Sequence, residues 1–176
     1  MFLKKGFDTY TIMPCDVFEV ALKSVTELAT KRGIKINVEG KEILDSYKHG
    51  IPWASAEGLP GYELYTAFWN LMQNAVKYSP DGSTIEVKFA EEVKDGIKHF
   101  VFAVSDNGIG ILEKDKPDVL KKRRRGSNVG KIEGTGYGLY RINSILTKVG
   151  SKLDIVSPLE ANRGTKVGFS LELQGK

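Results

Sequence analysis

The sequence predicts an α/β fold, because segments with helical periodicity alternate along the chain with segments that read as strands. In 62–78, apolar residues recur three and four positions apart, which is typical of an amphipathic helix. In 97–105, a β-rich apolar run alternates in the way that a buried strand does. The chain has 176 residues, of which 41% are hydrophobic and 27% charged, enough for one domain with its own core.

The predicted elements follow one another without an internal repeat or an interdomain linker. Asp16 and Gly33 are residue types favoured at the start and just past the end of the first helix. Residues 40–60 are punctuated by Gly and Pro and are expected to form a loop. We expect helices over about 17–32, 62–78 and 139–149, a short helix near 115–124, and strands over 34–38, 85–89, 97–105, 152–157 and 167–173.

Composition excludes several classes of protein. No apolar run approaches the length needed to cross a bilayer. One cysteine, Cys15, excludes an intramolecular disulfide and a cysteine-rich zinc site, and it fits a reducing, cytoplasmic setting. The net charge of +4 is concentrated in the basic run 121–125, which lacks interleaved aromatic residues, so we expect no nucleic-acid binding.

A carboxylate and two glycines follow the strand at 97–105. Gly108 and Gly110 permit positive φ and close approach of the backbone to a ligand. Asp106 at that point can accept a hydrogen bond from a flat ring with an exocyclic amine, such as adenine. Taken alone, however, Asp-Asn-Gly is more often an ordinary turn.

Two asparagines occupy the helix at 62–78, where they carry a propensity penalty. Asn70 and Asn74 are four residues apart and therefore share one side, with Lys77 one turn beyond. This side is either a polar outer face or a pair of amide oxygens for a hard cation such as Mg²⁺, which commonly takes few ligands from protein.

The glycines between Gly134 and Gly138 open the helix that follows and are a candidate phosphate cradle. They are not a Walker A loop, because Gly-Lys-Ser/Thr is missing, nor a dinucleotide fingerprint, because no strand leads directly into them. The pair Gly164-Thr165 precedes the last strand and, taken alone, reads as a simple hairpin turn.

Together and in this order, the motifs resemble the GHKL (HATPase_c) ATPase superfamily, and more closely the catalytic and ATP-binding domain of sensor histidine kinases. Residues 68–80 are similar to that family's N box, 106–110 to its G1 box and 134–139 to its G2 box. The resemblance runs from about residue 14 to 174. It implies the Bergerat ATP-binding fold, a two-layer α/β sandwich in which a mixed sheet of about five strands carries helices on one face.

The resemblance also assigns roles, with ATP and Mg²⁺ as cofactors. Asn74 would ligate Mg²⁺, and Asn70 and Lys77 would complete the catalytic group. Asp106 would accept from the adenine amine, backed by Thr165. The other implied nucleotide-binding residues are Lys77, Tyr78, Gly108, Gly110, Arg125, Gly134, Thr135, Gly136, Tyr137, Gly138 and Leu139.

Two departures from the family pattern involve three positions. ATP-hydrolysing relatives carry a general-base Glu where this chain has Asn70, and an amide cannot take a proton from water, which favours phosphotransfer to a protein. Leu120 and Arg123 stand where histidine kinases place lid aromatics, so we do not expect the family's usual hydrophobic anchor for this lid. Arg125 matches the family's basic residue before Gly126, and the resemblance implies that it would reach phosphate. We expect the rest of the basic run to be solvated rather than to steer ATP or bind an acidic partner.

The function implied by the resemblance is transfer of the γ-phosphoryl group of Mg-ATP to a protein histidine in two-component signalling. The alternatives are an anti-sigma-factor-type serine kinase and a degenerate nucleotide-binding module that acts by docking. We expect 1–13 to be a linker remnant and 14–176 the catalytic domain. The expected partners are a phosphoacceptor histidine domain, in the same native chain or another protein, and a response regulator. We also expect the isolated domain to be a monomer and to lie in the cytoplasm, either on its own or as the cytoplasmic part of a membrane-anchored kinase. We expect no membrane contact by this fragment.

Overall fold

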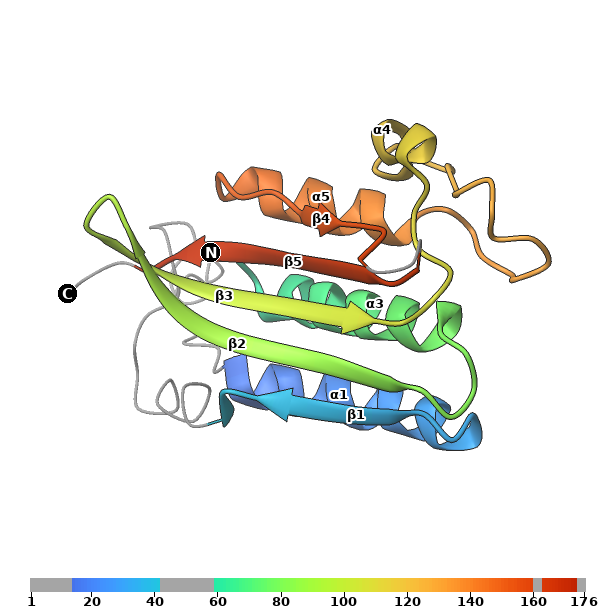
Figure 1. Cartoon of the computed structure of the whole chain (residues 1–176). Helices are drawn as coiled ribbons and strands as arrows, with labels where there is room; N and C mark the ends of the chain where they lie inside the picture. The colour runs from blue at the N-terminus through green and yellow to red at the C-terminus, as the bar shows by residue number, and fades with distance from the viewer. Residues whose placement is uncertain (1–13, 42–58, 160–162, 174–176) are drawn as a thin grey trace, which may run out of the picture.

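A computed structural model describes residues 14–41, 59–159 and 163–173, and it has the predicted α/β architecture (Figure 1). The predicted loop at 40–60 lies mostly outside the described residues. The described elements are α1 (Pro14–Lys31), β1 (Lys35–Glu39), α3 (Gly61–Tyr78), β2 (Thr84–Lys94), β3 (Ile97–Asp106), the 3₁₀ helix η2 (Glu113–Asp115), α4 (Lys116–Val119), α5 (Gly138–Lys148), β4 (Asp154–Val156) and β5 (Thr165–Glu172).

The sheet is mixed, as the resemblance implied. Its described strands lie in the order β1-β2-β3-β5-β4. β1 runs parallel to β2, whereas the other neighbouring strands are antiparallel. The register of β3 and β5 sets Asp106 opposite Thr165 at one end of the ladder. Two residues that are 59 positions apart in the sequence therefore become direct neighbours through strand pairing alone.

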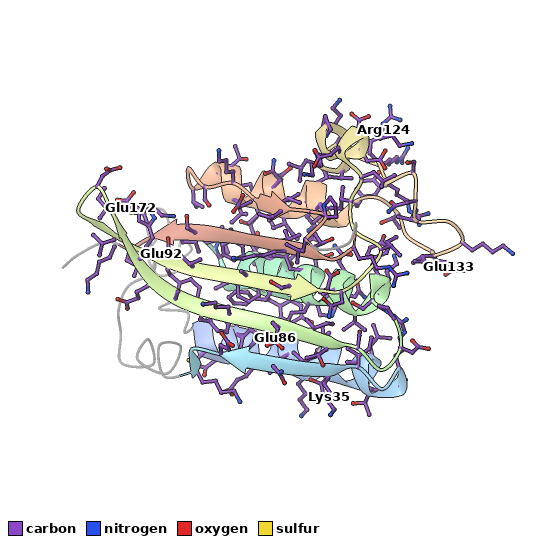
Figure 2. The ribbon with its side chains drawn as sticks, viewed as in Figure 1. Lys35, Glu86, Glu92, Arg124, Glu133 and Glu172 are labelled. Carbon is purple, nitrogen blue, oxygen red and sulfur yellow. The ribbon has the colours of Figure 1, made fainter. Side chains whose placement is uncertain are left out.

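The long helices α1, α3 and α5 cover one face of the sheet, and Figure 1 shows α1 and α3 lying behind it. Alternation along the strands explains this, because Phe100 and Phe102 of β3 point into the core while Glu86 and Lys88 of β2 point into solvent. Figure 2 shows Glu86 on the face away from the helices. The core is rich in aromatic rings, among which Phe68 of α3 lies 4.6 Å from Phe102 between ring centroids.

Helix α3 lies between α1 and α5 and carries the predicted N box. Its C-terminus is fixed by Arg32, which follows α1. The Arg32 guanidinium donates to the carbonyls of Val76, Lys77 (3.2 Å) and Ser79 (2.8 Å) and also pairs with Asp81. The carbonyls of Val76 and Lys77 belong to the last turn of α3 and that of Ser79 to its C-cap, where helical backbone donors do not reach them. Arg32 thus holds the end of α3 at which the site begins.

The elements differ from the predictions mainly in length. β2 continues to Lys94, beyond the predicted 85–89, and forms a hairpin with β3 over the turn at Asp95 and Gly96. The helix predicted near 115–124 is divided into η2 and α4 and ends at Val119. The segment after it is irregular because its basic residues face solvent and offer no apolar stripe for a longer helix. Among the described residues, no helix is both long and apolar enough to cross a membrane.

Candidate functional site

A cavity of about 300 Å³ lies between α3, the adjoining ends of β3 and β5, and the segment that joins Asp106 to α5. The residues between Ile111 and Tyr137 form its outer wall and are called the lid below. Most of the predicted site residues line this cavity. They are Asn70, Asn74, Lys77, Tyr78, Asp106, Gly110, Arg125, Gly134, Thr135, Gly136, Gly138, Leu139 and Thr165.

Asp106 forms one end of the cavity, where β3 stops. Its carboxylate accepts the backbone N–H of Gly108 at 2.8 Å and is also bonded by the backbone of Thr165. Burial nevertheless dominates and raises the pKa of Asp106 from 3.8 to about 6, with the two backbone bonds opposing the shift. At neutral pH the site therefore holds a half-buried, ionised carboxylate with acceptor capacity left for a ligand. We call the part of the cavity lined by Asp106 and Thr165 the base end, after the nucleotide base that the sequence motifs lead us to expect there.

Gly108 does not line the cavity, although the sequence suggested that it would pass beside a ligand. Its backbone packs instead against the end of α3. A Cβ atom at this position would lie 2.6 Å from the carbonyl oxygen of Tyr78. The next residue, Ile109, donates its N–H to that same carbonyl at 3.3 Å. Gly108 is therefore required for the close approach of the turn to α3, and it positions Asp106 from behind.

Ser157, which the sequence motifs did not indicate, connects three segments behind Asp106. Its side chain is 2% exposed. Its hydroxyl oxygen lies 2.7 Å from the backbone nitrogen of Ile111, 2.9 Å from the carbonyl oxygen of Gly164 and 3.2 Å from Oγ1 of Thr165. The only local signal was a serine at the end of a short strand, which is too common to identify a site.

Asn70 and Asn74 line the cavity where α3 approaches the start of α5. Asn70 donates its Nδ2 to the carbonyl of Thr66 at 2.7 Å, which leaves its Oδ1 directed away from the helix. Both side chains approach Gly138 at the start of α5, where a Cβ atom would lie 3.4 Å from Oδ1 of Asn70 and 3.9 Å from Oδ1 of Asn74. Both amides line the cavity, so this polar side of α3 faces the cavity.

These donors suit a magnesium ion that keeps most of its ligands from phosphate and water. Mg²⁺ prefers oxygen ligands and commonly takes only one or two from protein. Asn70 and Asn74 supply neutral amide oxygens beside the start of α5. Within the described part of the chain, no group of three or more His, Cys, Asp or Glu residues could hold a metal by itself. A cation here would thus depend on the negative charge of its ligand.

Two basic side chains converge on Gly134. A Cβ atom on Gly134 would lie 2.5 Å from Nζ of Lys77 and 3.7 Å from Nε of Arg125. Arg125 donates through Nη2 to the carbonyl of Ile132, whereas its Nε is buried without a hydrogen-bond partner. A buried donor without a partner is expensive, and an anion in the cavity would supply the missing acceptor. The part of the cavity beside Gly134, where Lys77 and Arg125 converge, is therefore suited to phosphate.

The lid is attached to the body although it lacks the aromatic residues typical of the family. Val119 is buried and lines the cavity, and Leu120 packs against the core. Arg123 donates its Nε to the hydroxyl of Tyr137 at 2.6 Å, and Lys122 lies 5.7 Å from the centroid of the same ring. Tyr137 does not line the cavity, so in this structure it anchors the lid.

Gly136 and Asn128 fix the lid at two further points. Gly136 has φ +70°, and a Cβ atom there would lie 2.7 Å from the carbonyl oxygen of Arg124, so no larger residue fits the contact. Asn128, which the motifs also missed, donates its Nδ2 to the carbonyls of Ile109 (3.1 Å) and Gly110 (3.0 Å). Asn128 thereby ties the lid to the turn that follows Asp106.

The basic run is divided between solvent and cavity. The side chains of 121–124 are exposed, in agreement with the solvated lid that the sequence favoured, yet Arg124 and Arg125 also line the cavity. Figure 2 shows Arg124 beside α4 and Glu133 on the loop that leads toward α5, at opposite parts of the lid. Lys121 pairs with Asp118 at 2.6 Å. The basic run 121–125 follows α4, and Asp118 offsets part of its charge.

Residues 61–175 match the family model described as histidine kinase-, DNA gyrase B- and HSP90-like ATPases. The chain therefore belongs to this ATPase family, which confirms the resemblance to the GHKL superfamily. Within the family it is similar to sensor histidine kinases. It is 34% identical over 92 residues to sensor histidine kinase Hik2 of Synechocystis sp., which covers 51% of this chain and 21% of that protein.

Other relatives point the same way. The chain is 35% identical over 100 residues to the phosphate regulon sensor protein PhoR of Pseudomonas aeruginosa, covering 54% of this chain and 21% of that protein. It spans about a fifth of the length of Hik2 and PhoR. Among solved structures, a mycobacterial sensor histidine kinase, MprB, aligns with a TM-score of 0.68 at 23% identity, over 92% of this chain and 95% of that one. This structural likeness confirms the fold.

Proposed function

We propose that this chain binds Mg-ATP in the cavity and donates the γ-phosphoryl group to a histidine of a protein partner in two-component signalling. Membership of the ATPase family and similarity to sensor histidine kinases support this proposal. A solved relative of the same fold, ShkA, is described in complex with AMPPNP. The two chemically different ends of the cavity match the two ends of a nucleotide.

In this proposal, Asp106 accepts a hydrogen bond from the adenine amine, and Lys77 and Arg125 bind the phosphates. Asn74 holds the metal, with Asn70 beside it. When bound, Mg²⁺ would neutralise phosphate charge, which is a large part of what phosphoryl transfer requires. The side chains otherwise position the phosphates, and the lid keeps water away from them.

The observation that carries the choice of acceptor is the distribution of carboxylates. Among the described residues that line the cavity, Asp106 is the only carboxylate, and it lies at the base end. The position one turn before Asn74 is occupied by Asn70, which cannot act as a general base. A serine hydroxyl or a water would need such a base, whereas a neutral imidazole is nucleophilic without one. Transfer to histidine is therefore favoured over serine phosphorylation and over hydrolysis.

The acceptor histidine is proposed to lie on another domain or protein. His99 of β3 does not line the cavity, and His49 lies outside the described residues. The phosphorylated partner would then pass the group to a response regulator. Residues 14–176 would act as the phosphoryl-donating domain.

The proposal is tested by incubating the chain with γ-labelled ATP, Mg²⁺ and the dimerisation domain of a sensor histidine kinase. We expect acid-labile label on the acceptor and none on an acceptor whose histidine is replaced by glutamine. Acid-stable label would indicate a serine kinase instead. ATP binding without transfer to any of a panel of such acceptors would favour a docking module.

A further inference from the structure

We infer that Ser157 helps to select the base of the bound nucleotide, by fixing the direction in which the Thr165 hydroxyl points its proton. Ser157 is buried behind the base end of the cavity and does not line it. It would therefore act as a positioning residue for Thr165, which does line the cavity beside Asp106. The inference rests on the proposed function, since it requires a nucleotide base at Asp106.

The protons at Ser157 can be assigned from its partners. A serine hydroxyl has one proton to donate and two lone pairs that accept. The backbone nitrogen of Ile111, at 2.7 Å, can only donate to it. The carbonyl oxygen of Gly164, at 2.9 Å, can only accept from it, so the single Ser157 proton is directed there. The opposite choice would leave two acceptor oxygens facing each other at 2.9 Å.

The assignment fixes Thr165 as well. Its Oγ1 lies 3.2 Å from the Ser157 oxygen. Because the Ser157 proton is already used, Thr165 must donate across this contact. Its hydroxyl then offers only lone pairs to the cavity. The nearby Asp106 carboxylate, when ionised, is also an acceptor and has no proton to give.

The base end of the cavity consequently presents acceptors side by side. A base with an amino group at this edge can satisfy them, whereas a base with a carbonyl oxygen there would face oxygen against oxygen. Sites built from fixed polar groups reject mismatched analogues because buried groups are left unpaired. Adenine and hypoxanthine differ at this edge, where the 6-amino group of ATP is replaced by the 6-oxo group of ITP. ITP is therefore the appropriate probe.

Ser157→Ala would remove the acceptor of the Thr165 hydroxyl, which could then rotate and donate its hydrogen bond into the cavity. Thr165 could then donate to the 6-oxo group of ITP, while the N1–H of that base donates to Asp106. We expect the ratio of ITP to ATP dissociation constants to fall about fivefold in Ser157→Ala, which corresponds to one neutral hydrogen bond. The double variant Ser157→Ala with Thr165→Val should lose this gain, because the released donor is gone.

Ser151→Ala is the matched control. Ser151 is also a partly buried serine close to β4, and its hydroxyl donates to the carbonyl of Ser170 at 2.6 Å, but it does not line the cavity. In Ser151→Ala, the ratio of the ITP to the ATP dissociation constant should remain within about twofold of the wild-type ratio. Affinities are measured by calorimetry with Mg²⁺ at pH 8, where the Asp106 carboxyl is ionised.

Equal losses of ATP and ITP affinity in Ser157→Ala would overturn the inference and leave Ser157 with a structural role alone. If Ser157→Ala does not fold, Ser157→Cys replaces it. Because a thiol is a weak donor and acceptor, this variant should also lower the ratio of the ITP to the ATP dissociation constant. An unchanged ratio in Ser157→Cys overturns the inference. Failure of the wild-type chain to bind ATP would instead overturn the proposed function and the inference with it.

Discussion

The base end of the cavity and its lid are held together in different ways. The base end is fixed by strand pairing, by the Asp106 and Thr165 register and by the buried hydroxyl of Ser157. The lid contains only the short elements η2 and α4, and it is held by side-chain contacts such as those of Asn128 and Arg123. Backbone ladders are hard to distort, whereas single polar contacts near the surface are weak.

This difference suggests a division of labour. Under the proposed function, the rigid end would select the nucleotide, and the lid would govern how easily the nucleotide enters and leaves. Substitutions in the rigid end should change affinity strongly, and substitutions in the lid should change exchange rates modestly.

Asp106→Asn should weaken Mg-ATP binding about 100-fold, because a charge-assisted bond to the adenine amine is lost. The same change should raise the thermal stability of the ligand-free protein at pH 8, since burial raises the pKa of this carboxyl to about 6 and opposes its ionisation. Calorimetry and thermal melts measure the two effects. Asp154→Asn, on the exposed surface of β4, is the control and should change neither. Unchanged ATP affinity in Asp106→Asn would remove Asp106 from the site.

Asn74→Ala should weaken ATP binding about 30-fold in the presence of Mg²⁺ and by less than about threefold in EDTA, because the lost group acts through the cation. The comparison of titrations with and without Mg²⁺ isolates this role. Asn37→Ala, which removes an exposed amide that donates to Glu86 on the sheet, should have no effect. A loss of equal size in EDTA would show that Asn74 contacts the nucleotide directly.

ATP affinity should depend on pH through Asp106. The pKa of this carboxyl is about 6 in the folded protein against an ordinary value of 3.8. Since the ionised form binds the amine, affinity should fall about tenfold between pH 7 and pH 5. Stability of the ligand-free protein has the opposite sign: the contribution of this group is present below pH 3.8 and is lost as pH rises through about 6. Asp106→Asn should abolish both dependences, and their persistence would assign them to another group.

Asn128→Ala should increase the dissociation rate of nucleotide about fivefold, because two hydrogen bonds between the lid and the turn after Asp106 are lost. Stopped-flow release of a fluorescent ATP analogue measures the rate. Asn143→Ala, on α5 outside the cavity, is the control. A change in association without any change in dissociation would contradict the role of Asn128 in holding the lid.

Tyr137→Phe should have the smallest effect, about a twofold faster release, because it removes the bond from Arg123 but keeps the ring against Lys122 and Arg123. Tyr137→Ala should increase the rate of nucleotide release more, about fourfold, since both the hydrogen bond and the ring contacts are lost. The same release assay applies, with the exposed Tyr62→Phe as control. Equal effects of the Phe and Ala changes would mean that the ring contributes nothing.

The sequence predicts the rigid part of this molecule well and the lid poorly. Strand alternation and helical periodicity are local signals, and they locate α3, β3 and α5 to within a residue or two at their site ends. The motifs also gather Asn74, Asp106 and Gly134 in one cavity. Ser157 and Asn128 escape prediction because tertiary packing sets their partners: Ser157 bonds Ile111, 46 residues away in sequence, and Asn128 bonds carbonyls 18 and 19 residues away.

Gly108 and Tyr137 show a second limit of sequence reasoning. Both were expected to contact nucleotide, yet neither lines the cavity. A motif indicates that a residue type is needed, but not whether the need arises from a ligand or from packing. In this structure Gly108 packs against the carbonyl of Tyr78, and the Tyr137 hydroxyl accepts a hydrogen bond from Arg123.

The most direct test of this account is a crystal structure of the chain with a non-hydrolysable ATP analogue and Mn²⁺, which anomalous scattering locates unambiguously. We expect the adenine amine within hydrogen-bond distance of the Asp106 carboxylate, the metal against the side-chain oxygen of Asn74, and the phosphates between Lys77 and Arg125. A nucleotide bound with its base at the asparagines, or outside this cavity, would contradict it.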